Sequence, residues 1–60
     1  MLKEYIVKKG LKQKYIAEKM GVSEVTVSNW VKGKMRPNEQ HLIELAAILD
    51  VSIEKLRLAI

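Results

Sequence analysis

The sequence contains no cysteine and only one histidine, His41. Without cysteine there is no disulfide, no thiolate ligand and no thiol nucleophile, and one histidine cannot assemble a metal site alone. The sequence has no glycine-rich phosphate loop, and no motif places an acidic or hydroxyl partner beside His41. We therefore expect no enzymatic activity, no metal and no cofactor. A pocket of ordinary ligand volume is hard to form in so small a core, so no small-molecule substrate is expected either.

Long apolar runs are also missing. The longest is a few residues, whereas a membrane-spanning helix needs roughly 20. The amino end lacks the apolar segment of a signal peptide, so we expect a cytoplasmic protein with no membrane partner. The chain has 60 residues, which is enough for one domain, and a chain of this length buries only about 60 % of the surface that its unfolded form exposes.

Positive charge is in excess and unevenly distributed. Eleven lysines and arginines against seven acidic residues give a net charge of +4, and all of these basic residues except Lys55 and Arg57 lie in the first 36 positions. Four of the seven acidic residues come later. This distribution favours an anionic partner such as nucleic acid for the basic half, although a solvated lysine-rich surface is the alternative.

Glycine, proline and capping residues divide the chain into short helical segments. We expect five helices, at residues 2–9, 13–20, 24–32, 39–49 and 53–58. Three glycines end the first three helices, and three polar residues cap the last three: Gly10, Gly21 and Gly33, then Ser23, Asn38 and Ser52. No alternating pattern is long enough for a sheet, so the expected fold class is all-α.

Five short helices cannot each be stable alone, so they must share one core within a single domain, residues 1–60. Apolar positions at helical spacing are expected to build this core: Ile6, Ile16, Ala17, Met20, Val22, Val27, Trp30, Leu42, Leu45, Ala46, Leu49 and Leu56. Ile43, Ile48, Leu58 and Ile60 cannot all face it. Some of these four should form an exposed apolar patch, suited to a homodimer interface.

Residues 13–32 have the pattern of two helices that cross steeply over a tight turn. Ala17 supplies the small side chain needed at the crossing, and Gly21 tolerates positive φ in the turn. The second helix then directs four side chains away from the core: Glu24, Val25, Ser28 and Asn29. Amides and hydroxyls can read base edges in the major groove, and methyl groups can contact thymine.

The segment LKQKYIAEKMGVSEVTVSNWVKGKMRPN resembles the helix-turn-helix of the lambda repressor and Cro family. The residues that carry the match are Gln13, Ala17, Gly21, Val22, Val27 and Trp30, followed by Gly-Lys and a proline. The match extends over about residues 2–57. The resemblance implies a compact five-helix bundle, with its helix-turn-helix at 13–32, that binds double-stranded DNA, usually as a homodimer on a palindrome. We accordingly expect a sequence-specific transcriptional regulator with residues 24–32 in the major groove. A repressor is the preferred interpretation, but the family contains both repressors and activators, and the sequence does not decide between them.

The resemblance also implies roles for individual residues. Glu24, Val25 and Asn29 would face bases, with Ser28 nearby. The residues expected to meet phosphates are Lys12, Gln13, Lys14, Lys32, Lys34 and Arg36.

Three positions leave alternatives open. Lys12 stands where the family often has threonine or serine, so the helix after it is less well capped and the lysine could reach a phosphate. Glu24 is acidic where many relatives have an amide; it either accepts a hydrogen bond from a cytosine amine or serves only the helix dipole. Tyr15 either covers the edge of the core or contacts a phosphate.

A protein-interaction module is the alternative function. Relatives with this fold can act as antitoxins or adaptors, and the surplus apolar residues of the carboxyl-terminal helices would then dock onto another protein. Many relatives carry a further effector domain, and none is evident in this sequence. We therefore expect control through protein concentration, competition for sites or a partner protein.

Overall fold

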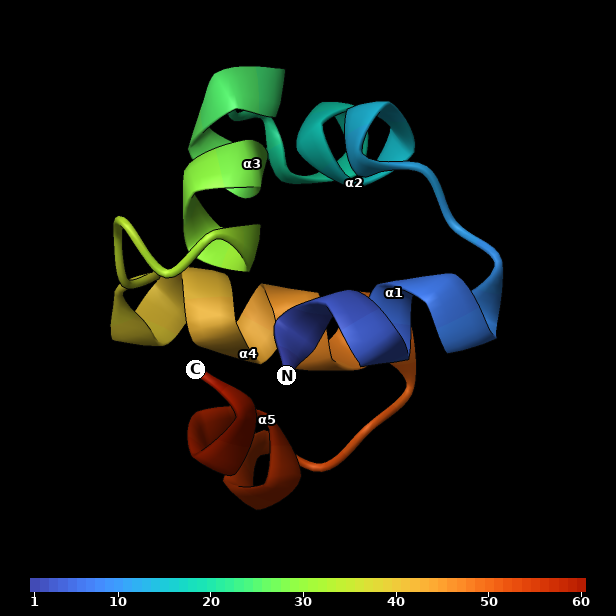
Figure 1. Ribbon diagram of the computed structural model, residues 1–60, viewed down its shortest axis with the longest axis vertical. Helices are drawn as coiled ribbons and strands as arrows, with labels where there is room; N and C mark the ends of the chain where they lie inside the picture. Colours follow the sequence, from blue (N-terminus) through green and yellow to red (C-terminus); the bar gives the residue numbers. More distant parts are fainter.

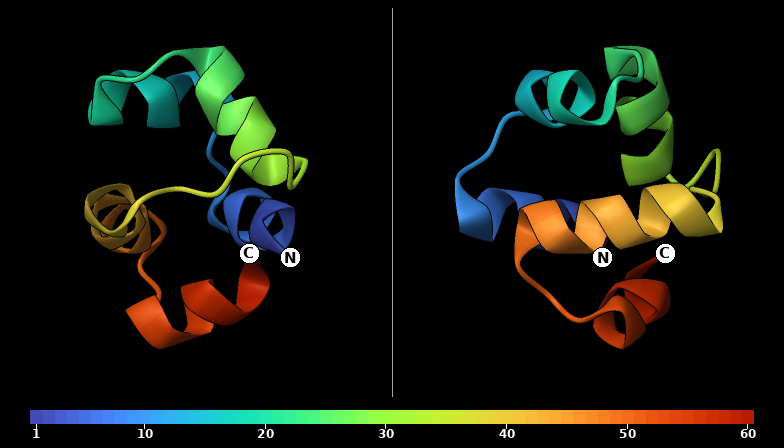
Figure 2. Two further views of the ribbon diagram at one scale, coloured as in Figure 1. Left: turned by 90° about the vertical axis from the view of Figure 1, so that its left-hand side faces the viewer. Right: turned by 180° about the vertical axis from the view of Figure 1, so that it is seen from behind.

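Five α-helices and no strand make up the structure, a computed structural model that describes residues 1–60. The helices are α1 (Leu2–Lys9), α2 (Gln13–Met20), α3 (Glu24–Val31), α4 (Glu39–Leu49) and α5 (Ile53–Ala59). Helices α2 and α3 form one end of the molecule, α1 and α4 lie across the middle, and α5 forms the other end (Figure 1 and Figure 2). The all-α class and the five-helix arrangement are thus confirmed.

The helix boundaries follow from local capping. The side chains of Ser23, Asn38 and Ser52 accept hydrogen bonds from backbone N–H groups three residues on, at 3.0, 2.8 and 3.1 Å. Gly10 and Gly21 end α1 and α2 in the left-handed conformation, with φ of 74° and 69°. The expected boundaries differ from the observed ones by one residue, at the ends of α3 and α5.

One apolar core joins all five helices. Its buried side chains are Leu2, Ile6, Ile16, Ala17, Val27, Trp30, Leu42, Leu45, Ala46, Leu49 and Leu56. Two expected members, Met20 and Val22, are only half-buried, because they lie at the end of α2 and in the turn, at the rim of the core. Leu2 was not expected in the core, yet it is buried there, on a helix that packs against α3 and α4.

Helix α5 packs on the core through the buried Leu56 and the partly buried Ile53, and one ion pair joins it to α4. Leu56 is fully buried, and the Arg57 guanidinium donates two hydrogen bonds to the Glu39 carboxylate of α4, at 2.8 and 2.6 Å. These hydrogen bonds, and the positive charge of Arg57, keep the pKa of Glu39 below its ordinary value, while the Glu39 carboxylate raises the pKa of Arg57. The longest helix, α4, has 11 residues, and no helix has the length and apolar character to cross a bilayer.

Candidate nucleic-acid interface

The turn between α2 and α3 sets the angle of the two helices. The backbone N–H of Val22 donates to the Ala17 carbonyl at 3.1 Å, and that of Gly21 donates to the Glu18 carbonyl at 3.4 Å. This pair of bonds is a Schellman motif, which reverses the chain immediately after the helix. Ala17 is buried in the core, as expected for a small residue at the crossing.

Helix α3 is anchored on one face and open on the other. Val27 and Trp30 are buried, and the Trp30 ring lies 5.3 Å from the His41 ring of α4, measured between centroids. The Thr26 backbone N–H bonds the Ser23 side chain, and the two hydroxyls are 2.9 Å apart. Thr26 therefore completes the cap of α3, which explains a hydroxyl-bearing residue at this position.

The four residues expected to face bases lie on α3 with different exposures. Val25 is 68 % exposed, Glu24 is also exposed, and Ser28 and Asn29 are half-buried. Neither the Ser28 hydroxyl nor the Asn29 amide takes part in any of the side-chain hydrogen bonds of the protein. The polar groups of this face are thus free to bond a ligand, and Val25 offers it an apolar side chain.

The amino end of α2 has no protein partner. Lys12 occupies the N-cap position without a side-chain cap, and the first turn contains no acidic residue. Each of the other four helices has a glutamate in its first turn. The first backbone N–H groups of α2, which begin at the half-buried Gln13, are therefore left for an external acceptor, and the helix dipole makes an anion the favoured one.

Lysines surround this helix end. Lys12 and Lys14 line one shallow surface hollow together with Tyr15, which is exposed and does not cover the core. Glu18 lines the same hollow, so Tyr15 shares it with two cations and one carboxylate.

The loop after α3 is fixed against the end of that helix. The Asn29 carbonyl accepts hydrogen bonds from the backbone N–H groups of Lys34, at 2.9 Å, and Met35, at 3.3 Å. Pro37 is buried at the end of this loop. The exposed side chain of Lys34 consequently starts from a backbone that α3 itself positions, and the exposed Arg36 follows two residues later.

All the cations expected to meet phosphates are exposed and unpaired. The protein has three ion pairs, formed by Met1 with Glu4, Lys9 with Asp50 and Arg57 with Glu39. None involves the five cations of the expected set: Lys12, Lys14, Lys32, Lys34 and Arg36. They fall into two groups, one at the amino end of α2 and one after α3.

Two helices joined by a tight turn, the second of which presents its outer face to solvent, form a helix-turn-helix, an arrangement found in DNA-binding domains. A family model described as helix-turn-helix matches residues 2–56. The chain therefore belongs to the lambda repressor/Cro-like helix-turn-helix family, whose members are DNA-binding regulators. Among curated proteins and solved structures, nothing matches the chain.

Proposed function

We propose that residues 1–60 act as one domain that binds duplex DNA sequence-specifically, as a homodimer, and represses transcription by occupying its site. The observation that carries this proposal is the outward face of α3. Val25, Ser28 and Asn29 offer one apolar and two unbonded polar side chains there, between two groups of unpaired cations. A short helix with such a face suits the major groove.

Each residue on this face has a chemical role in the proposal. The Asn29 amide can donate to and accept from adenine, Ser28 can bond several bases, and the Val25 methyl groups can contact the methyl of thymine. Glu24 accepts from the amine of cytosine, which offsets the repulsion of its carboxylate by nearby phosphates. If no cytosine is selected opposite Glu24, its role is confined to the dipole of α3.

The phosphate contacts give affinity and orientation. Gln13 and the free N–H groups of α2 donate hydrogen bonds to one phosphate, with Lys12 and Lys14 on either side. Beyond the other end of the helix-turn-helix, Lys32, Lys34 and Arg36 meet the backbone near the carboxyl end of α3. Contacts of this type neutralise phosphates and release counterions, so they carry no sequence information and weaken as salt rises.

Exposed apolar residues support the homodimer. Leu58 on α5 is 90 % exposed, and Ile43 on α4 is also exposed. Ile48 and Ile60 instead pack half-buried against the core, so they contribute less to an interface than the sequence suggested. The same two exposed residues favour the second candidate function, docking of another protein on the carboxyl-terminal helices.

Selection of binding sites from a pool of random duplex DNA, at roughly physiological salt, tests the proposal because non-specific binding is weak there. We expect an enriched palindrome with half-site centres about 34 Å apart, one helical turn. A single enriched half-site would contradict the homodimer. No enrichment at all would contradict the regulator and favour a protein partner.

Two alanine variants then separate base reading from phosphate binding. Asn29→Ala keeps the carbonyl that holds the loop, and it should relax discrimination at one base pair by about 1–3 kcal/mol. Lys34→Ala should weaken binding to all sequences alike and lower the salt slope by about 1 per protomer. Lys55→Ala, at the opposite end of the molecule on α5 (Figure 1), is the matched control and should change neither. Equal loss across all sequences for Asn29→Ala would contradict its base-reading role.

A further inference from the structure

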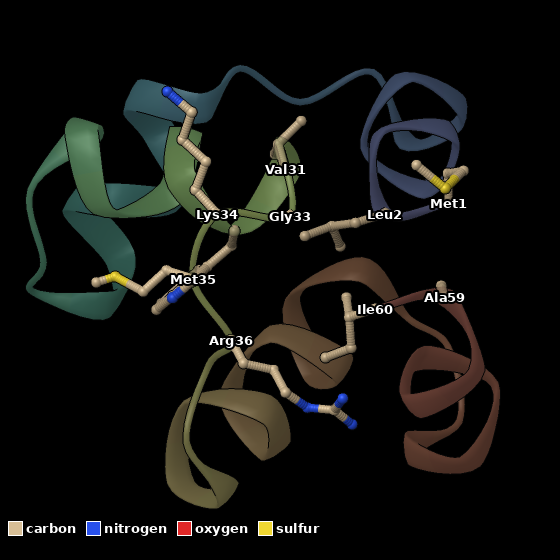
Figure 3. Close-up of a pocket in the computed structure, with 10 residues that line it drawn as sticks. Met1, Leu2, Val31, Gly33, Lys34, Met35, Arg36, Ala59 and Ile60 are labelled. Carbon is tan, nitrogen blue, oxygen red and sulfur yellow. The ribbon is translucent and has the colours of Figure 1, made fainter.

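The outer side of α1 combines exposed apolar side chains with a surface hollow. The hollow has a volume of about 550 Å³ and lies between α1 and the last residue of α3. Its apolar lining is Met1, Val7 and Val31, of which Met1 is 73 % and Val7 66 % exposed. Figure 3 shows Leu2 pointing from α1 toward the middle of the molecule, whereas Met1, the residue before it, stays beside α1. The apolar groups of this hollow are therefore accessible to a partner.

Val7 is the residue of this face that folding does not explain. It lies inside α1, where a β-branched side chain lowers helix propensity, and its exposure means that it adds little to the core. A lysine or glutamate at this position would suit a solvated surface better. Single exposed apolar residues are common, but Val7 shares one hollow with Met1 and Val31. Together they form a small patch of the kind that partner surfaces cover.

The rim of the hollow carries an excess of positive charge. Lys3 and Lys8 line it, and neither forms an ion pair. The one carboxylate side chain of the lining, Glu4, is paired with the terminal ammonium of Met1 at 3.2 Å. The carboxyl end of the chain, at Ile60, is not part of this lining. Three positive groups against one carboxylate leave two uncompensated charges, those of Lys3 and Lys8.

We infer that this hollow docks an acidic amphipathic helix of another protein. Apolar side chains of that helix lie against Met1, Val7 and Val31, and carboxylates beside them meet Lys3 and Lys8. Helix α1 has eight residues and is about 12 Å long, which matches two turns of a helix laid along it. Helices that dock in this way use apolar anchors at i, i+3, i+4 and i+7.

Two comparisons within the molecule favour this partner. A DNA backbone would use the lysines but would leave the apolar lining without a counterpart, so charge alone does not account for this face. The exposed Ile43 and Leu58, on α4 and α5, line none of the surface hollows. The face on α1 is therefore distinct from the carboxyl-terminal one, and its assignment does not rest on the proposed DNA binding.

Amide and methyl NMR of the DNA-free protein can locate the docked helix and measure its affinity. The probe is a helical peptide of about 14 residues, or four turns, with leucines at the anchor positions and glutamates beside them. We expect saturable shifts centred on Val7 and Val31, with weaker binding as salt rises. A matched peptide with lysines in place of the glutamates should bind about tenfold more weakly, since attraction at Lys3 and Lys8 becomes repulsion.

Two glutamine variants test the apolar contact. Val7→Gln should weaken the acidic peptide about fivefold, because the exposed part of the Val7 side chain can no longer be buried as an apolar group. Leu58→Gln, at an even more exposed position on α5, is the matched control and should leave the affinity unchanged. Circular dichroism verifies that both variants keep their helix content.

Several outcomes would overturn the inference. They include equal binding of the two peptides, no shift at millimolar peptide, and equal losses in the two glutamine variants. Shifts centred on Ile43 and Leu58 would assign docking to the carboxyl-terminal helices instead. Shifts centred on Lys12 and Lys34 would mean that the glutamates imitate phosphates at the DNA site. Because no DNA is present, failure of the proposed DNA function leaves the result of this experiment intact.

Discussion

Replacing Gln13 with glutamate is expected to move stability and DNA affinity in opposite directions. Gln13 is the first residue of α2, the one helix with no capping side chain and no acid in its first turn. A carboxylate there interacts favourably with the helix dipole and should raise the free energy of unfolding by about 0.3–1 kcal/mol. For a domain of this size, that corresponds to an increase in Tm of about 1–8 °C.

The same carboxylate should impair DNA binding. It repels the phosphate proposed to bind at the α2 amino end, and it replaces an amide donor that can reach this phosphate. Loss of one hydrogen bond to a charged group is worth at least about 1.5 kcal/mol, or about tenfold in affinity for each protomer. Thermal unfolding by circular dichroism measures the first effect. Titration of the selected operator at about 0.15 M salt measures the second.

Gln40→Glu is the matched control, because the chain has no other glutamine. Gln40 lies on α4, where Glu39 already occupies the first turn and the Gln40 amide bonds Glu44 at 3.1 Å. This variant changes the same charge without touching α2, so it should bind DNA nearly as the parent does. A Gln13→Glu variant that is stabilised but binds DNA at full affinity would refute the assignment of α2 to a phosphate. Equal losses of DNA affinity in both glutamate variants would show that the effect comes from net charge alone.

Three further predictions concern the framework that holds the site. Ser23→Ala removes the cap of α3 and should lower the free energy of unfolding by about 1 kcal/mol, seen as a lower Tm; an unchanged Tm would mean that the cap at Ser23 adds no stability. Gly21→Ala should lower the free energy of unfolding by about 1–2 kcal/mol through the positive φ alone, since an added Cβ would meet nothing within 4 Å. Urea unfolding measures this change, and an unchanged free energy would refute backbone strain at position 21. Because the folded-state pKa of Glu39 is lowered, its ion pair stabilises the protein above the ordinary glutamate pKa, and this contribution disappears as the pH falls through the lowered value. Arg57→Gln should flatten that part of the pH–stability profile, and an unchanged slope would show that the ion pair contributes nothing measurable.

Local chemistry explains why the helices could be predicted from the sequence. Their ends coincide with residues whose effect is confined to one turn, such as Gly21 with its positive φ and Asn38 with its side-chain cap. Burial was harder to predict, because it depends on what the rest of the chain covers. Leu2 lies at the start of α1 and is buried by the helices that pack around it, whereas Met20 has helical spacing but lies at the rim.

Only part of the candidate site could be predicted from the sequence in this way. The outward direction of Glu24 and Val25 follows from helical periodicity, and both are exposed. No local pattern indicates that the Asn29 carbonyl would hold the loop through Lys34 and Met35, or that His41 would lie against Trp30. Nor does the sequence place Val7 and Val31 in the lining of one hollow. These relations join positions that are not neighbours in any helical pattern, so they emerge only from the packed structure.

Several departures from stable local design occur on the proposed DNA face, although an exposed β-branched helical residue also occurs elsewhere, at Val7 of α1. Lys12 stands where a capping residue would stabilise α2, and Val25 exposes a β-branched side chain on a helix. The five expected phosphate-binding cations have no acidic partners, which is also true of Lys3, Lys8, Lys19 and Lys55, whereas Lys9 and Arg57 do have them. A protein shaped for stability alone would gain from a serine at position 12. Such conflicts between local preference and structure are typical of functional sites. Bound DNA would give each of these groups a partner: a phosphate for the uncapped end of α2, a base edge for Val25 and the phosphate backbone for the unpaired cations.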